Sequence, residues 1–416
     1  MRGPGFHGAG YIPLSMRGGG ALDIQWFLRD EFSDTRAAGA VNGTSATPGP
    51  GTRTVVDTGS DLSIGSDVLN FSGGVVGWGD PALVYADIPI VRTAGRMMLC
   101  SVTPATINGF IWFGFNNDTT PAEPWSGANT IYVTSAARIW TYDGNSVHYS
   151  VTYAATTYIF AVVLRTAGAY FFVKGGAFTN WTLFDIWGVN VTTPVYAAID
   201  FYDNVSTSGF IRVPDALWLP APAAYDTFTR GDGALGSSDI WGPDNQIVTA
   251  RAWSNRVGTT QIATNKASAS ALVGGVAIAT MDTGTVNAIT DATLTRAGNE
   301  VGVVLRYVDA DNYIRAIHDG TNCKLVKRVA AAETDVISAV VALGAGAIRV
   351  IPDGTTFMLY LNNARVGAVS TINDAALQTG TEQGLFSTNV GNTQDLWSIF
   401  ARGSNGEYAA LNKWSF

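Results

Sequence analysis

The sequence predicts an all-β protein made of two tandem antiparallel β-sandwich domains of jelly-roll type, with an extended N-terminal arm in front of them. Charged residues make up only 14% of the 416 residues, and 47 residues are glycine. Soluble globular proteins usually contain about 25% charged residues. The low charge, the many turn-forming residues and the short segments of alternating apolar and polar residues are typical of strands joined by tight turns.

The arm is predicted over residues 1–29. Seven of its first twenty residues are glycine, and it lacks the apolar run of a secretory signal. We expect this arm to lie along a neighbouring subunit and to contact it through Arg2, Phe6, Tyr11 and Arg17. The protein is therefore expected to form a homo-oligomer.

Two similar units follow the arm. Residues 30–34 (DEFSD) open the first unit and residues 226–230 (DTFTR) open the second, each before a run of small residues. Each unit then has a strand pair around a tight turn, at 158–178 and 346–369, and closes with two long strands, at 195–219 and 382–403. The predicted domains are residues 30–219 and 225–416, joined by the stiff linker PAPAA at 220–224.

Turn residues locate individual hairpins within these units. The segment FIWFGF at 110–115 is apolar almost throughout and is predicted to be a strand buried on both faces. Alternating residues on both sides of 309–312 predict a hairpin, and further turns are predicted at 352–354 (PDG) and 362–363 (NN). An open sheet with this many strands would leave exposed edges, which favours a two-sheet sandwich.

Composition excludes several classes of partner. The net charge is −8, and no basic stripe is present, so we expect no nucleic-acid binding. No apolar run approaches the length of about 18 residues that a membrane helix needs, so we expect no membrane insertion. Cys100 and Cys323 fall in different units, and are predicted to pack as small apolar side chains without a disulfide framework or a zinc site.

The order of elements resembles the concanavalin A-like lectin and glucanase fold, including the laminin-G-like modules. Three features carry the resemblance: the Asp-x-Phe openings at 30–32 and 226–228, the central hairpin FMLYLNNARVG at 357–367, and the closing segment DLWSIFA at 395–401. The resemblance covers nearly all of residues 30–416 and concerns the order of elements. It implies lectin-like sandwich modules.

The construction is also similar to that of virion proteins from tailed bacteriophages, in which glycine-rich arms precede jelly-roll or lectin-like modules. This resemblance implies a non-enzymatic structural component on the virion surface, such as a capsid decoration protein, a head fibre or a tail fibre. The arm would bind other virion subunits, and the modules would contact surface glycans. The alternative is a carbohydrate-binding protein of tandem lectin-like modules, either on a cell surface or extracellular.

No motif predicts catalysis. Glucanases of this fold have the pattern E-x-D-x-E on one strand, which is absent here. The glutamates are isolated from one another in the sequence: Glu31, Glu123, Glu300, Glu333, Glu382 and Glu407. The histidines, His7, His148 and His318, are expected at the surface or in turns, because no nucleophile motif accompanies them. We therefore predict no enzyme and no catalytic residue; a glycan hydrolase would require a carboxylate pair that meets in a cleft.

The first unit is the better candidate for sugar binding, because it has 28 aromatic residues against 14 in the second. Its candidate residues for a carbohydrate are Trp125, Trp140, Tyr142, Asn116 and Asp118. Packing in the core or at a subunit interface is the alternative role for the aromatic residues. No cofactor or metal is predicted. Calcium is the one ion considered, because oxygen ligands are offered by Asn116, Asn117, Asp118, Asp309 and Asp311. Such residues also favour turns.

Overall fold

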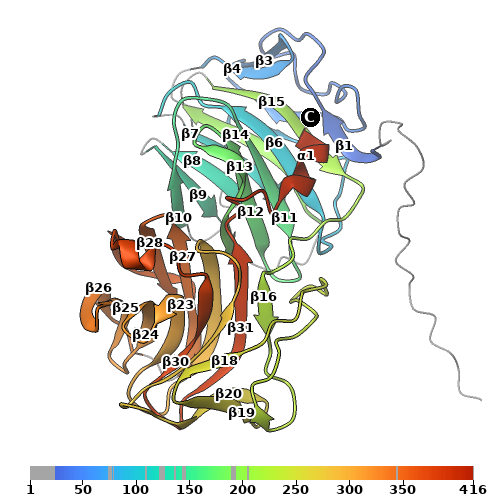
Figure 1. Cartoon of the computed structure of the whole chain (residues 1–416). Coiled ribbons are helices and arrows are strands. Elements are labelled where there is room, and N and C mark those ends of the chain that lie inside the picture. The colour runs from blue at the N-terminus through green and yellow to red at the C-terminus, as the bar shows by residue number, and fades with distance from the viewer. Residues whose placement is uncertain are drawn as a thin grey trace, which may run out of the picture.

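The structure, a computed structural model, describes residues 24–73, 77, 79–107, 110–120, 127–134, 137–142, 147–188, 194–203, 206–342 and 345–415. The described strands form four antiparallel sheets, which make up two sandwiches stacked on each other (Figure 1). The predicted all-β class with antiparallel sandwiches is confirmed. No described helix is long and apolar enough to cross a membrane.

The first sandwich has one sheet that faces the other sandwich, here called the first junction sheet. Its strand order is β13-β12-β11-β6-β15-β4-β3, with β1 paired to β15. Its strands are β1 (Trp26–Asp30), β3 (Leu62–Gly65), β4 (Val68–Phe71), β6 (Met97–Thr103), β11 (Tyr158–Leu164), β12 (Ala169–Gly175), β13 (Phe178–Trp187) and β15 (Ser206–Pro214).

The opposite sheet of this sandwich, the first outer sheet, has the order β10-β9-β8-β7-β14-β5-β2. Its strands are β2 (Thr54–Val56), β5 (Ala82–Val84), β7 (Phe110–Asn116), β8 (Gly127–Thr134), β9 (Arg138–Tyr142), β10 (Val147–Thr152) and β14 (Tyr196–Asp203). The predicted strand at 110–115 is confirmed as β7, whose residues from Ile111 to Asn116 are all buried.

The second sandwich repeats this arrangement. Its junction sheet has the order β17-β19-β20-β31-β22-β27-β28-β29, with β16 paired to β31. The strands are β16 (Ala224–Asp226), β17 (Gly233–Ala234), β19 (Thr259–Ala263), β20 (Lys266–Ala271), β22 (Ala288–Thr295), β27 (Ala345–Asp353), β28 (Thr356–Leu361), β29 (Ala364–Thr371) and β31 (Thr393–Ala401).

The second outer sheet has the order β18-β21-β30-β23-β24-β25-β26. Its strands are β18 (Ser254–Val257), β21 (Ala277–Asp282), β23 (Val301–Asp309), β24 (Asn312–His318), β25 (Asn322–Val329), β26 (Ala332–Val340) and β30 (Glu382–Ser387). Short helical turns complete the described chain: η2 (Ala375–Leu377), η3 (Ala409–Leu411) and α1 (Asn412–Ser415).

Strand order therefore shows the duplication that the sequence predicts. Each unit places its equivalent strands in the same order in both sheets, and only β17 has no counterpart among the described strands. The predicted hairpins are confirmed by the registers Asp309↔Asn312, Asp353↔Thr356 and Leu361↔Ala364. The domain bounds at 30–219 and 225–416 stay a prediction.

The Asp-x-Phe openings have the same conformation in both units. Phe32 and Phe228 have positive φ values of 50° and 56°, which non-glycine residues rarely adopt. The carboxylates of Asp30 and Asp226 accept the backbone N–H of these phenylalanines, at 3.0 and 2.7 Å. Each aspartate is fully buried, so this motif builds the start of each sandwich.

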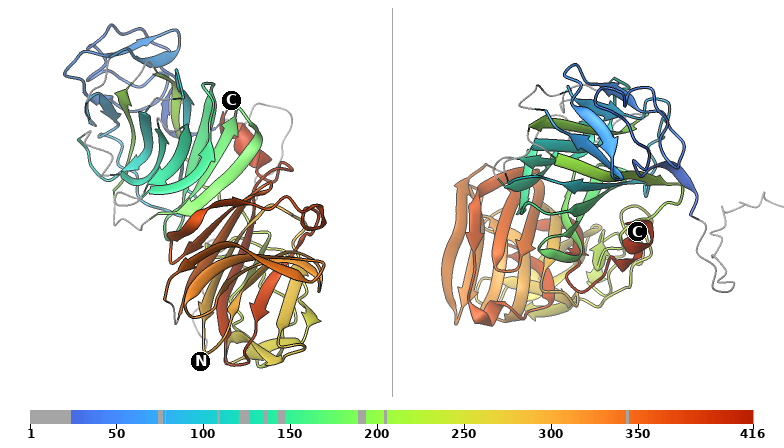
Figure 2. Two further views of the ribbon diagram at one scale, coloured as in Figure 1. Left: turned by 90° about the vertical axis from the view of Figure 1, so that its left-hand side faces the viewer. Right: turned by 90° about the horizontal axis from the view of Figure 1, so that it is seen from above.

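The two junction sheets pack face to face (Figure 2). In β6, Met98 and Cys100 point into the core of the first sandwich, whereas Met97 and Leu99 belong to the cluster between the sandwiches. Opposite them lie residues of the second unit, among them Met358 and Phe400. Because both faces of these strands are covered, their sequences are continuous apolar runs.

The end of the chain also packs on the first sandwich. Arg212 Nη1 donates a hydrogen bond to the Trp414 carbonyl at 2.9 Å, and Lys174 Nζ donates one to Asn412 Oδ1 at 2.7 Å. Arg402 Nη1 donates to the carbonyls of Leu183 and Phe184 at 2.9 and 3.0 Å. These contacts join the last described segment of the second unit to the first sandwich.

Candidate functional site

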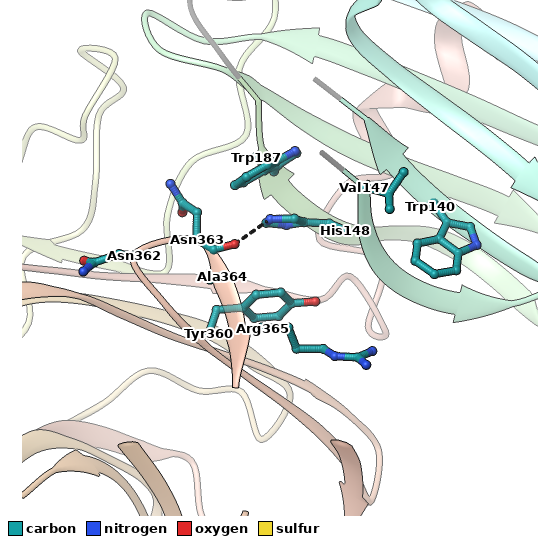
Figure 3. Close-up of a pocket in the computed structure, with 9 residues that line it drawn as sticks. All are labelled: Trp140, Val147, His148, Trp187, Tyr360, Asn362, Asn363, Ala364 and Arg365. Atoms are coloured by element: carbon teal, nitrogen blue, oxygen red, sulfur yellow. Dashed lines mark hydrogen bonds between the residues drawn. The ribbon is translucent and has the colours of Figure 1, made fainter. Parts of the chain in front are cut away.

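A pocket of about 460 Å³ lies where the two sandwiches meet (Figure 3). The first sandwich contributes β9, β10 and the end of β13, and the second contributes β28, β29 and the turn between them. The lining residues are Trp140, Val147, His148, Trp187, Tyr360, Asn362, Asn363, Ala364 and Arg365. Because both units supply lining residues, neither sandwich alone forms the pocket.

Aromatic rings form the floor of this pocket. The imidazole of His148 is only 4% exposed, and it lies between the rings of Trp187 and Tyr360. The His148 ring centroid is 3.3 Å from that of Trp187 and 5.0 Å from that of Tyr360, whose plane is tilted by 24°. His148 was expected at the surface or in a turn, and this prediction is wrong, because the second sandwich covers the edge of β10.

Asp185 lies behind His148. Alternate residues of a strand share a face, so β13 directs Asp185 and Trp187 to the same side. Asp185 Oδ2 accepts a hydrogen bond from Thr141 Oγ1 at 2.5 Å and is 3.4 Å from His148 Nδ1. Burial by itself would raise the pKa of the Asp185 carboxyl, but His148, Arg349 and Thr141 outweigh it and lower this pKa below its ordinary value.

The turn between β28 and β29 forms one rim. Asn362 and Asn363 have φ values of 49° and 65°, the left-handed conformation that both central residues of a type I′ hairpin turn require. Asn362 Oδ1 accepts the Ala347 N–H at 2.8 Å, which ties the turn to β27. The turn presents the Asn363 carbonyl to His148 Nε2 at 2.8 Å.

Trp140 stands at the opposite rim. Figure 3 shows its indole beside Val147, with the asparagine turn on the other side of the pocket. Trp140 Nε1 donates a hydrogen bond to Thr134 Oγ1 at 3.1 Å, which fixes the ring, and the side chain is half-buried. Of the residues that the sequence proposed for carbohydrate, Trp140 lines this pocket.

The other proposed residues lie elsewhere. Tyr142 is 5% exposed and Asn116 is 1% exposed, and neither lines the pocket, because the first outer sheet buries both side chains. Asp118 is exposed in a local turn, where its Oδ1 accepts the Thr120 N–H at 3.0 Å. Trp125 and the arm residues Arg2, Phe6, Tyr11 and Arg17 lie outside the described residues.

The candidate calcium ligands on the second sandwich accept hydrogen bonds within a turn. Asp309 Oδ1 accepts the Asp311 N–H at 2.8 Å and the Asn312 Nδ2–H at 2.9 Å. Within the described ranges no group of three or more His, Cys, Asp or Glu side chains is placed to hold a metal ion. Cys100 and Cys323 are both buried and unpaired, as expected of small apolar side chains, and burial raises the pKa of each thiol to about 12.

Two of the glutamates expected to be isolated are brought together on the second outer sheet. Arg315 donates to both oxygens of Glu333, at 2.7 and 2.9 Å, and its Nη2 is 3.4 Å from Glu300. Burial raises the pKa of the Glu300 carboxyl. Burial would also raise that of Glu333, but the hydrogen bonds from Arg315 lower it. Glu300 directly precedes β23, and the pairing of β23 with β24 brings it to Arg315; the pairing of β24 with β25 and of β25 with β26 brings Glu333 there. The distance between these residues in the sequence gives no sign of this contact.

Arg315 nevertheless occupies the space between these carboxylates, and Arg328 Nη1 donates to Glu333 at 3.0 Å as well. Glu333 therefore forms part of an ion-pair network. In the pocket between the sandwiches, the Asp185–His148 pair has acid–base groups, but His148 Nε2 is already bonded to the Asn363 carbonyl. In both arrangements, acid–base groups therefore make hydrogen bonds or ion pairs within the protein.

Sequence reasoning missed most of the pocket. His148, Asp185 and Trp187 lie on β10 and β13 of one unit, and Tyr360 and Asn363 belong to the other. The two adjacent asparagines predict the turn at Asn362 and Asn363, but the neighbouring sequence does not indicate which residues the turn contacts. The alternation of Asp185 and Trp187 shows that they share a face, and only the packing of the sandwiches shows what covers it.

No family model matches the chain, and no curated protein matches it. Among solved structures, the chain is similar to the carbohydrate-binding module CBM66 from Bacillus subtilis, with 15% identity and a TM-score of 0.28 over 36% of this chain and 92% of that one. It is also similar to the laminarinase from Rhodothermus marinus, with 9% identity and a TM-score of 0.31 over 46% and 97% of the two chains.

A third similar structure is the galectin LEC-6 from Caenorhabditis elegans, with 11% identity and a TM-score of 0.22 over 27% of this chain and 81% of that one. Nothing in these comparisons indicates a phage origin.

Proposed function

We propose that the protein binds carbohydrate in the pocket between its two sandwiches, without cleaving it. The observation that carries this proposal is the half-exposed indole of Trp140 opposite the asparagine turn. An aromatic face packs against the apolar face of a sugar ring, and side-chain amides and arginine bind its hydroxyl groups. The pocket offers both, since Trp140, Asn363 and Arg365 all line it.

The size and shape of the pocket support the same function. A volume of about 460 Å³ lies in the range of small-ligand sites, so the pocket suits a short oligosaccharide or the end of a longer chain. The rings of Trp187 and Tyr360 are held by packing before any ligand arrives, which lowers the entropy cost of binding.

The test is a glycan array followed by titration calorimetry with the glycan that binds best. We expect Trp140→Ala to weaken binding of that glycan at least tenfold, because the stacking surface is lost. Asn363→Gly should also weaken it, since glycine keeps the positive φ of the turn and removes only the amide.

Trp241→Ala is the matched control, because Trp241 is 56% exposed and does not line the pocket. It should leave affinity unchanged. After incubation with the protein, the glycan that binds should be recovered intact. No binding to any glycan on the array, or equal affinity of the Trp140→Ala and Trp241→Ala variants, would contradict the proposal.

A further inference from the structure

Another hollow, here called the linker groove, lies beside the segment that joins the two sandwiches. It has a volume of about 600 Å³. The chain before the linker contributes Leu217 and Trp218 to its lining, and the second unit contributes Trp241, Asp244 and Ile247. None of the residues that line this groove lines the pocket proposed for carbohydrate.

Large apolar side chains are open to solvent in the linker groove. Leu217 is 50% exposed, Trp241 is 56% exposed and Ile247 is 77% exposed. A group of exposed apolar side chains marks an interaction site, because contact of such surface with water is unfavourable. The carboxylate of the groove, Asp244, already accepts the Thr166 N–H at 2.8 Å. The groove therefore suits an apolar occupant.

Hydrogen bonds hold the walls of the groove in place. The Trp218 N–H donates to the Gly95 carbonyl at 2.8 Å, and Gln246 Nε2 donates to the Pro220 carbonyl at 3.2 Å. The two exposed residues that the second unit contributes form a β-bridge with each other. The groove is thus formed before an occupant arrives, which lowers the entropy cost of docking.

The first described residues lie next to this groove. β1 is antiparallel to β15, with Trp26 opposite Pro214. The Asp215 N–H donates to the Gln25 carbonyl at 3.0 Å, which continues this pairing by one residue. Because the strands are antiparallel, the chain before Gln25 is directed along the chain after Asp215. Leu217 is only two positions further on, so the described chain begins close to a wall of the groove.

The sequence before β1 contains an apolar run, YIPL, at residues 11–14. Its last residue, Leu14, is ten positions before Ile24, and ten extended residues span about 35 Å, which is enough to reach the groove. Pro13 favours an extended backbone for itself and for the residue before it, a shape that suits a groove. Residues 1–22 contain two arginines and no carboxylate, whereas the whole chain has a net charge of −8, so the two are complementary in charge.

We propose that residues 11–14 dock in the linker groove of the same chain and cover its exposed apolar side chains. The glycines at 18–20 allow the chain to turn between the groove and β1. The docked arm ties the start of the chain to the second unit as well as to the first. The sequence predicts a contact of the arm with a neighbouring subunit, so the arm of a second copy is the alternative occupant. The proposal does not depend on carbohydrate binding.

Tryptic cleavage after Arg17 tests the docking, with mass spectrometry of the full chain as the measurement. A protease cleaves an accessible segment, so its rate follows the fraction of undocked arm when docking and release are fast. We expect cleavage at least tenfold slower than in a peptide of residues 1–23. Ile247→Ser should accelerate it about tenfold, because the apolar contact is lost. Leu14→Ser should do the same from the other side of the contact.

Val340→Ser is the matched control, because Val340 is 79% exposed and does not line the groove. It should leave the rate of cleavage unchanged. Leu14 precedes both sandwiches, so Leu14→Ser remains informative if circular dichroism shows that Ile247→Ser alters the fold.

Cleavage as fast in the full chain as in the peptide would overturn the proposal. Equal rates in the Leu14→Ser variant and the unchanged chain would do so too. A rate that rises on dilution would mean that a second copy holds the arm, which also contradicts docking within one chain.

Discussion

At the scale of single residues, each sandwich begins at a buried aspartate. Asp30 and Asp226 are both 0% exposed, and each is neutralised by an arginine. Arg53 Nε is 2.6 Å from Asp30, and Arg230 Nη1 is 2.7 Å from Asp226. The two arginines come from different positions of the repeat. Both units therefore pair the buried aspartate with an arginine, but each unit supplies that arginine from a different part of its sequence. A buried ionised carboxylate requires such a partner.

The first prediction follows from this pair. Asp30→Asn removes one of the two carboxylates that pair with Arg53, which is also 0% exposed, and leaves Asp34 as its remaining countercharge at 2.8 Å. The free energy of unfolding should fall by about 1 to 3 kcal/mol, the usual cost of removing the partner of a buried polar group, as measured by urea denaturation. Asp67→Asn is the control, because Asp67 is exposed and Asn tolerates its φ of 59°. A loss no larger than that of the control would mean that the ion pair is dispensable.

At the scale of elements, the central strands of the second outer sheet depend on close backbone approach. Gly302 on β23 is paired with Ile317 on β24, and a Cβ added there would lie 1.9 Å from the Ala316 carbonyl oxygen. Gly384 on β30 is similarly tight, at 2.0 Å from the Ala279 carbonyl oxygen. These contacts are with backbone, which cannot move aside as a flexible side chain can, so glycine sets the spacing of β21, β30, β23 and β24.

Replacement of Gly302 by alanine should therefore destabilise the protein by about 1 to 3 kcal/mol, the usual cost of overpacking. Thermal unfolding followed by circular dichroism would measure it. Gly231→Ala provides the comparison, since nothing lies within 4 Å of a Cβ at that position. The two variants should differ clearly; equal melting temperatures would show that β23 can shift to accept the methyl group.

At the scale of the whole molecule, two equivalent sheets are buried against each other. Tyr170 and Phe400 come from the two sandwiches, and their ring centroids are 5.2 Å apart in the cluster between them. Because the junction is apolar and extensive, we expect the sandwiches to unfold together as one cooperative unit. The pocket depends on this packing, since its two rims belong to different sandwiches.

This expectation of cooperative unfolding can be tested by replacing a phenylalanine at the junction and, for comparison, one in the core of a single sandwich. Phe400→Ala removes packing at the junction, and Phe357→Ala removes it from the core of the second sandwich. Each should cost about 3 to 5 kcal/mol. Only Phe400→Ala should separate the single calorimetric transition into two, because it weakens the contact between units. Two transitions in both variants, or in neither, would show that the junction does not control cooperativity.

The sequence by itself determined the all-β class, the hairpins at 309–312, 352–354 and 362–363, and the duplication of the two units. These features depend on the alternation of apolar and polar residues and on the residues that favour turns. Both act over a few residues and can therefore be recognised in the sequence. The tertiary structure alone decided that the junction sheets bury their second faces against each other, that Glu300 and Glu333 meet on Arg315, and that His148 reaches Asn363. An apolar run such as that of β6 shows that both faces of a strand are covered, but the identity of the covering face depends on contacts between residues hundreds of positions apart.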